Sequence, residues 1–295
     1  MLDSRPTIRR RATVGNYIKL TKPRIIELLL VTTVPMMMLA QGGWPSTWLV
    51  AATVIGGSLS AGGANVLNMV CDRDIDAEMG RTADRPLVTG EIPVRNALAF
   101  GVILGLVGHV WLTATAGGLA AWLTTGALLF YVGIYTMVLK RRTTQNIVIG
   151  GVAGAVPVLV GSAAVTGGVS LEAAVLFLVV CLWTPPHFWA LAIHYRDDYR
   201  GAGVPMLPVV AGVGSTIHQI RIYTVATVAA SLLVILGREV GLVYLLPVLA
   251  TGVWFIVGSI RLTEDRAMAF FRDSIMYLTI LFAMVAADAL VGPPI

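Results

Sequence analysis

A dense cluster of charged residues follows the second long apolar run of this sequence. The segment NMVCDRDIDAEMGRTADRP, residues 68–86, holds five acidic residues and three arginines, whereas 13% of the whole chain is charged. Asn68, Asp72 and Asp76 recur every four residues, so on a helix their side chains share one face. Acidic residues at that spacing repel unless a cation lies between them. Oxygen ligands suit Mg²⁺, which leaves other positions to water and phosphate. The spacing predicts a magnesium site, with a solvated acidic loop as the alternative.

Basic residues follow these acids and recur at a second place in the chain. Arg81 and Arg85 come within ten residues after Asp76. A guanidinium presents a planar fork that matches two phosphate oxygens, so arginines beside metal-binding carboxylates indicate a diphosphate site. Lys140 and Arg141 form a second basic cluster at the end of an apolar run, and Tyr135 precedes them. Control of topology at a membrane edge is the alternative interpretation of this second cluster.

A third group of ionisable residues lies in the segment 184–210. His187 and His194 are seven residues apart on an aromatic-rich, proline-containing run, and Asp197 and Asp198 follow directly. Seven residues are close to two helical turns, so both histidines can share a face. Ionisable groups inside a membrane span are candidates for function. A histidine that is hydrogen-bonded only for packing is the alternative.

These residues require membrane-spanning helices to position them. The chain is 57% hydrophobic, and its charged share is about half the ~25% of soluble domains. We therefore expect an all-α polytopic integral membrane protein with one domain over residues 1–295. Runs of about 20 apolar residues cross the hydrocarbon core as helices. Nine such spans are predicted, at residues 25–42, 46–67, 97–115, 118–138, 147–167, 171–193, 219–237, 240–260 and 274–292.

The distribution of lysine and arginine predicts the orientation of these spans. Of the 21 basic residues, all but Arg238 fall in the N-terminal region or in the loops after spans two, four, six and eight. The positive-inside rule makes this side cytoplasmic. It holds a basic tail, 1–23, and three candidate active-site loops, 68–96, 139–146 and 194–218. Topology thus accounts for the basic pI of about 9.5, and we expect no nucleic-acid partner.

Four segments of the chain resemble a known family. They are LTKPR at 20–24, residues 68–92, residues 135–151 and residues 185–210. In order and spacing they are similar to the UbiA-type intramembrane prenyltransferases. The NxxxDxxxD element marks the superfamily, whereas RTADRPL, TTQNIVIGG and DYRGAGVPMLPVV resemble the branch that farnesylates heme.

The resemblance implies a fold, a reaction and a location. The fold would be a bundle of about nine transmembrane helices around a central cavity. The reaction would transfer the farnesyl group of farnesyl diphosphate to a vinyl group of heme B (protoheme IX), with addition of water, giving heme O for terminal oxidases. The implied cofactor is Mg²⁺, and the implied surroundings are the lipid of a bacterial cell (inner) membrane. A downstream heme A synthase is a candidate partner.

The resemblance also implies roles for individual residues. Asn68, Asp72 and Asp76 match the first magnesium motif, and Asp198, with Asp197 as the weaker candidate, matches the second acidic site. Many relatives carry DxxxD there, but Gly201 and Ala202 stand at the fourth positions here, which leaves the ligands of a second metal open. The residues matching the family's diphosphate-binding set are Arg81, Arg85, Lys140 and Arg141, and Tyr135 matches a catalytic tyrosine. We further expect His187 or His194 to contact the heme.

Two other functions remain open at this point. A prenyltransferase acting on an aromatic quinone precursor would keep the diphosphate site and differ in its acceptor pocket. A membrane transporter could also use kinked helices and buried histidines. Transporters place their binding groups near the middle of the membrane, whereas the acids here cluster at one membrane edge, which disfavours that reading.

Overall fold

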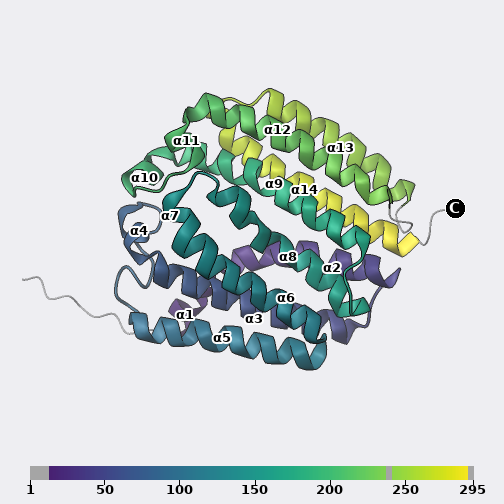
Figure 1. The fold of residues 1–295 in the computed structure, drawn as a ribbon, viewed down its shortest axis with the longest axis horizontal. Coiled ribbons are helices and arrows are strands. Elements are labelled where there is room, and N and C mark those ends of the chain that lie inside the picture. Colours follow the sequence, from purple (N-terminus) through teal and green to yellow (C-terminus); the bar gives the residue numbers. More distant parts are fainter. Residues whose placement is uncertain (1–12, 237–240, 292–295) are drawn as a thin grey trace, which may run out of the picture.

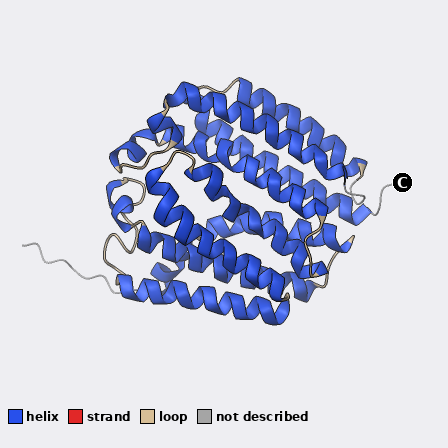
Figure 2. Ribbon diagram, viewed as in Figure 1, coloured by secondary structure: helices blue, strands red, loops and turns tan. Residues whose placement is uncertain are grey.

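The computed structural model describes residues 13–236 and 241–291, without the side chains of residues 24–30. Throughout these residues the chain is helical and contains no strand (Figure 2). The basic residues at positions 1–12 of the predicted tail, and Arg238, lie outside the described residues. Of the predicted tail, residues 14–21 form a helix, α1 (Val14–Thr21), which packs against α3 and buries Leu20.

Long helices packed side by side form the body of the protein (Figure 1). In chain order these principal helices of the described residues are α2 (Pro23–Gln41), α3 (Thr47–Cys71), α5 (Val94–Thr115), α6 (Gly118–Leu129), α8 (Asn146–Thr166), α9 (Leu171–His194), α12 (Gly212–Leu232), α13 (Leu242–Ile260) and α14 (Ala267–Val291). Helix α6 continues without a break through a π-helix, η1 (Phe130–Leu139), into α7 (Lys140–Arg142). The shorter elements are α4 (Arg73–Glu78), α10 (Arg196–Gly201), α11 (Leu207–Val210), η2 (Leu233–Leu236) and η3 (Glu264–Arg266).

The described residues contain eight helices that are long and apolar enough to cross a membrane. The first predicted span, 25–42, coincides with α2, and of this helix the side chains of Val31–Gln41 are described. Two helices begin before the spans predicted at 219–237 and 274–292, because α12 starts at Gly212 and α14 at Ala267. Charged residues such as Arg272 and Asp273 mark the edge of the hydrocarbon region, and a helix can continue beyond that edge into the interface. The protein is a polytopic integral membrane protein.

Helices α3 and α5 pack closely, and this contact fixes the helix that carries the predicted metal residues. A β-carbon added at Gly63 would lie 2.7 Å from the carbonyl oxygen of Gly101, and one at Gly108 would lie 3.0 Å from the carbonyl oxygen of Gly56. Side chains at these positions would therefore push the two backbones apart. Small residues allow this close approach in lipid, where association depends on packing rather than on the hydrophobic effect.

Helix α13 is held at both ends by charged side chains of its neighbours. Asp288 on α14 accepts hydrogen bonds from the backbone N–H groups of Gly241 and Tyr244, at 2.7 and 3.1 Å. At the other end, the Arg221 guanidinium on α12 donates to the carbonyls of the last two residues of α13, at 3.2 and 3.0 Å. An anion at the N-terminus and a cation at the C-terminus both complement the helix dipole and satisfy backbone groups that lack partners within the helix. The three helices α12, α13 and α14 are thereby tied together.

Candidate active site at the end of α3

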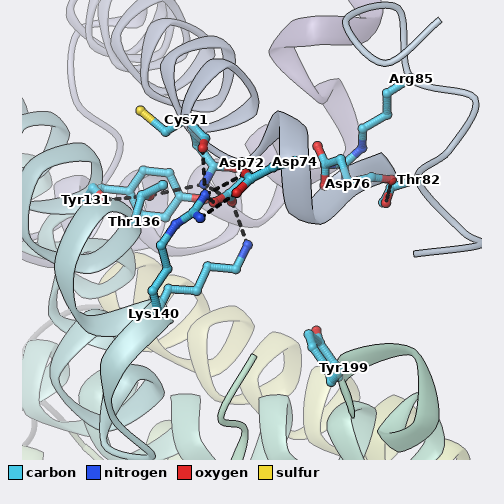
Figure 3. Close-up of polar contacts among 12 residues, drawn as sticks. Cys71, Asp72, Asp74, Asp76, Thr82, Arg85, Tyr131, Thr136, Lys140 and Tyr199 are labelled. Carbon is cyan, nitrogen blue, oxygen red and sulfur yellow. Dashed lines mark hydrogen bonds and ion pairs between the residues drawn. The ribbon is translucent and has the colours of Figure 1, made fainter. Parts of the chain in front are cut away.

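Asn68, Asp72 and Asp76 lie on one side of the junction between α3 and α4. The backbone N–H of Asp72 donates to the carbonyl of Asn68, and that of Asp76 donates to the carbonyl of Asp72, both at 2.8 Å. The four-residue pattern therefore continues through the end of α3, although Asp72 itself is the capping residue between the helices. All three residues are buried, with 4%, 1% and 4% of their surface exposed. We call these three residues the ledge, and Figure 3 shows two of them, Asp72 and Asp76.

Cationic side chains from distant parts of the chain contact the ledge. Lys140 Nζ lies 2.5 Å from Asp72 Oδ2, and Arg85 Nη1 lies 2.5 Å from Asp76 Oδ2. Arg141 Nη2 is 3.8 Å from Asp72 Oδ1. The structure thus brings three of the four predicted basic residues to the carboxylates, from the loop after α4 and from the end of the long α6–η1–α7 helix.

Arg141 also binds Asp74, an exposed acid that is not part of the ledge. Its guanidinium makes two hydrogen bonds to the Asp74 carboxylate, at 2.6 and 2.7 Å. The hydrogen bond to Arg141 lowers the pKa of Asp74 from 3.8 to about 2. Asp74 remains 65% exposed at its side chain, so we assign this pair to holding Arg141 in place rather than to binding a metal.

The fourth predicted basic residue, Arg81, contacts a different element. Its Nη2 donates to the hydroxyl of Tyr199 on α10 at 2.9 Å. The guanidinium carbon also lies 5.1 Å from the ring centroid of Tyr195 and 5.3 Å from that of Tyr199, within the range of a cation–π contact. Burial raises the pKa of the Tyr199 phenol, and the neighbouring Arg81 cation opposes this rise. Arg81 therefore joins the loop after α4 to α10.

The two acids of the predicted second site differ in their surroundings. Asp197 is 80% exposed at its side chain and pairs with Arg200 at 2.7 Å and with Arg196 at 3.7 Å. Asp198 is half-buried, and its negative charge contributes to raising the pKa of the neighbouring Tyr199 phenol. Within the described residues, no group of three His, Cys, Asp or Glu side chains is placed to hold a metal ion. Asp198 therefore lies closer to the buried part of the site than Asp197 does.

The two histidines do not share an environment, although their spacing placed them on one face. His187 is buried between the rings of Trp183 and Phe271, with centroids 4.2 and 4.4 Å away. Its Nδ1 is hydrogen-bonded to Ser274 Oγ at 2.8 Å. His194 is exposed at the end of α9. The seven-residue spacing moves a side chain about 10 Å along a helix, which here is the distance from the packed interior to the surface.

Tyr135 lies on the π-helix η1 against α8. Its ring stacks on that of Tyr131, with centroids 5.4 Å apart and an interplanar angle of 20°. On the other side a β-carbon at Gly150 would collide with the Tyr135 ring. Because Gly150 has no side chain, the Tyr135 ring can pack directly against the backbone of α8.

Lys22 is a site residue that the sequence patterns did not single out. Its Nζ donates to Asn68 Oδ1 at 3.0 Å. It stands between α1 and α2 in the left-handed backbone region, with φ of 52°. Burial lowers the pKa of the Lys22 ammonium from 10.5 to about 7, and the Arg85 cation acts in the same direction. The sequence offered two signals: Lys22 lies in the LTKPR segment that resembles the family, and it stands immediately before a proline.

The ledge suits a divalent cation. Among the described residues, Asp72 Oδ1 is buried without a hydrogen-bond partner, although Arg141 lies within ion-pair distance. An unbonded buried carboxylate oxygen beside a second carboxylate and an amide gives few protein ligands, which is the arrangement that Mg²⁺ takes when phosphates complete its shell. A helical membrane bundle with such a ledge, faced by lysine and arginine at one membrane edge, defines an intramembrane enzyme for diphosphate esters.

Comparison with known proteins identifies the family. Residues 29–283 match the model of the UbiA prenyltransferase family, and the chain belongs to this family. It is 52% identical to the protoheme IX farnesyltransferase of Clavibacter michiganensis subsp. michiganensis, over 93% of this chain and 92% of that protein. It is also 52% identical to protoheme IX farnesyltransferase 1 of Saccharopolyspora erythraea, over 98% and 94% of the two chains.

Solved structures show the same fold at low sequence identity. A structure of digeranylgeranylglyceryl phosphate synthase aligns with a TM-score of 0.79 at 18% identity, over 94% of this chain and 99% of that one. A UbiA homolog from Archaeoglobus fulgidus, bound to GPP and Mg²⁺, aligns with a TM-score of 0.62 at 16% identity, over 92% and 99%. The chain therefore has the fold of these structures. Its membership of the UbiA family and its half-identical relatives make it a prenyltransferase.

Proposed function

We propose that this protein transfers the farnesyl group of farnesyl diphosphate to a vinyl group of heme B, with addition of water, to give heme O and diphosphate. The main support for farnesyl diphosphate as the donor substrate is the buried ledge, whose carboxylates are paired with Lys140, Arg85 and Arg141. The relatives named protoheme IX farnesyltransferase, about half identical over nearly the whole chain, support heme as the acceptor.

Asn68, Asp72 and Asp76 are the residues that would hold Mg²⁺. The bound ion would supply positive charge to the oxygens of the leaving diphosphate. Asp198 is the candidate for a second acidic ligand because it is partly buried beside Tyr199. Asp197 stays a sequence prediction, and its exposed pairing with Arg200 does not support it.

The cations around the ledge stabilise the leaving group. When the bond between farnesyl C1 and its oxygen breaks, the electron pair goes to the diphosphate. Lys140, Arg85 and Arg141 then face the growing negative charge, which is where preorganised donors lower a barrier most. Lys22 lies on the Asn68 side and donates to the Asn68 amide oxygen. These same cations pair with the carboxylates in the free site, so substrate binding exchanges one set of anionic partners for another.

The allylic cation formed at C1 needs an apolar, dry surrounding until the acceptor reacts. Tyr131 and Tyr135 stack beside the ledge, and their ring faces can stabilise a nearby cation. The π electrons of the heme vinyl group attack C1, and positive charge moves to the vinyl carbon next to the porphyrin ring. Water adds to that carbon and loses a proton, which leaves the hydroxyl group of the product.

His187 is the better of the two histidine candidates for contact with heme, through the iron or a propionate. Hydrogen bonding of Nδ1 to Ser274 fixes the ring and leaves Nε2 as the nitrogen for a ligand. Stacking between Trp183 and Phe271 holds the ring in an aromatic environment that suits a porphyrin. His194, exposed at the end of α9, remains the second candidate.

The membrane placement is part of the same proposal. The bias of lysine and arginine toward one side supports a cytoplasmic face for the site and its loops. With bacterial relatives, this supports a location in the bacterial inner membrane. A heme A synthase that consumes the product is a candidate partner, because the farnesylated heme is too apolar to leave the membrane readily.

A direct assay separates the possible acceptors. Purified protein in detergent is incubated with Mg²⁺, farnesyl diphosphate and heme B, and the product is identified by mass spectrometry. Parallel reactions contain 4-hydroxybenzoate in place of heme. We expect a farnesylated, hydrated heme alone. Asp72→Asn and Asp76→Asn should abolish it, whereas the exposed Asp265→Asn should not. Prenylation of 4-hydroxybenzoate but not of heme would overturn the proposed acceptor, and product formation by Asp72→Asn would overturn the metal site.

A further inference from the structure

Thr136 makes two hydrogen bonds that together determine which way its hydroxyl points. It is fully buried on the π-helix η1. Its Oγ1 lies 2.8 Å from the carbonyl oxygen of Tyr131 and 3.1 Å from Asn68 Nδ2. A hydroxyl carries one proton, and a carbonyl can only accept. Thr136 therefore donates to Tyr131 and presents only lone pairs to Asn68.

This arrangement fixes the orientation of the Asn68 amide. The atom of Asn68 that faces Thr136 must be the donor, Nδ2. The same nitrogen donates to Asp72 Oδ2 at 2.8 Å, and an ionised carboxylate also only accepts. With both amide protons engaged, Oδ1 is turned to the opposite side, where it accepts from Lys22 Nζ at 3.0 Å. A flipped amide would set an oxygen against two acceptors and an NH₂ group against an ammonium.

The π-helix is what places Thr136 at this point. Its hydroxyl bonds the carbonyl five residues earlier, and the backbone N–H of Lys140 likewise bonds the carbonyl of Tyr135, five residues back. Such widened turns are rare and are frequent at functional sites. From the same stretch of helix, Thr136 contacts Asn68. Lys140 contacts Asp72 (Figure 3).

We propose that Thr136 is a positioning residue for the ledge, which holds the Asn68 amide with Nδ2 donating to Asp72 and Oδ1 turned to the Lys22 side. It acts on the cation site through Asn68. This inference rests on the proposed role of the ledge and adds a residue that the motif does not contain. It explains why an asparagine can serve at this position, since an amide binds a cation at one end only.

The test measures metal binding rather than turnover. Free Mn²⁺ is titrated by its EPR signal into detergent-solubilised protein with inorganic diphosphate. Thr136→Val keeps the shape and removes the acceptor, and we expect it to weaken Mn²⁺ binding about tenfold, as for loss of one hydrogen bond to a buried site group. Thr136→Ser keeps the hydroxyl and should bind within about twofold of the unmodified protein. Thr224→Val removes a buried hydroxyl that bonds only its own helix, and should change nothing.

A double-mutant cycle identifies the route of the effect. In an Asn68→Ala background there is no amide to orient, so adding Thr136→Val should change Mn²⁺ binding by less than about twofold. An equal loss in both backgrounds, or a Thr136→Ser variant as weak as Thr136→Val, would overturn the inference. So would Thr136→Val binding as well as the unmodified protein. Failure of the unmodified protein to bind Mn²⁺ with diphosphate would instead contradict the proposed metal site.

Discussion

Replacing Lys22 by methionine should make the substrate-free protein more stable and its diphosphate site weaker. The lysine is half-buried and donates to Asn68, and burial lowers the pKa of its ammonium to about 7. Folding therefore opposes the charged form that the unfolded chain prefers at neutral pH. Methionine keeps most of the volume of the side chain and has no charge to desolvate.

The size of this effect follows from the two pKa values. A fall from 10.5 to about 7 corresponds to roughly 4 kcal/mol at pH 7. Because the side chain is partly open to solvent, we reduce this to about 2 kcal/mol, which raises Tm by roughly 4–8 °C for a chain of this size. Between pH of about 7 and 10.5 the unfolded state binds the proton and the folded state does not. The stability of the unmodified protein therefore rises with pH across that window and is flat below it.

The assay is thermal unfolding in detergent with a chelator present, followed by tryptophan fluorescence at several pH values from about 6 to 9.5. We expect a higher Tm for Lys22→Met and loss of the rise with pH. Binding of farnesyl diphosphate with Mg²⁺ should weaken about tenfold, because the hydrogen bond that Lys22 donates to Asn68 is lost. The matched control is Lys19→Met, an exposed lysine on the same short helix. A lower Tm for Lys22→Met, or an unchanged pH slope, would refute the reasoning.

Three further predictions concern residues that position the reacting groups. Gly150→Ala should push the Tyr135 ring out of place and lower kcat more than about tenfold, from overpacking of ~1–3 kcal/mol, while Mn²⁺ binding with diphosphate stays unchanged; weakened Mn²⁺ binding would contradict this. Tyr199→Phe removes the hydroxyl that accepts from Arg81 and should raise the KM for farnesyl diphosphate about tenfold with little change in kcat; an effect on kcat alone would count against it. In His187→Ala, titration with heme should no longer give the spectral change of the unmodified protein, whereas farnesyl diphosphate binding should be kept. A heme titration identical to that of the unmodified protein would rule out His187 as the heme contact.

Local regularity made part of the site predictable. Asn68, Asp72 and Asp76 share one side because the hydrogen-bond pattern of α3 persists into α4, so a rule about helix spacing was sufficient. The pairing of Lys140 with Asp72 spans 68 residues of sequence. It was predictable only as far as both segments had to reach the same membrane edge. Which cation meets which carboxylate depends on the packing of the bundle.

Other features depend on departures from regular helix, and sequence patterns carry no information about those. Asp198 ranked above Asp197 only through the resemblance to the family, because the helix is interrupted at Tyr195 between α9 and α10 and helical spacing does not carry across that interruption. Lys22 reaches the ledge through a left-handed backbone turn, and Thr136 reaches it through a π-helix. Each looks like an ordinary basic or hydroxyl residue until the backbone is known.

The clamp on α13 bears on how the protein responds to its bilayer. Asp288 and Arg221 neutralise the two ends of this helix from within the protein, so neither end has to recruit water or a phospholipid headgroup. Its depth in the membrane is then set by α12 and α14 rather than by lipid charge. We expect the half of the bundle containing these helices to tolerate a switch from anionic to zwitterionic lipid, so that any sensitivity of activity to lipid composition originates at the cationic edge around α4 and α7.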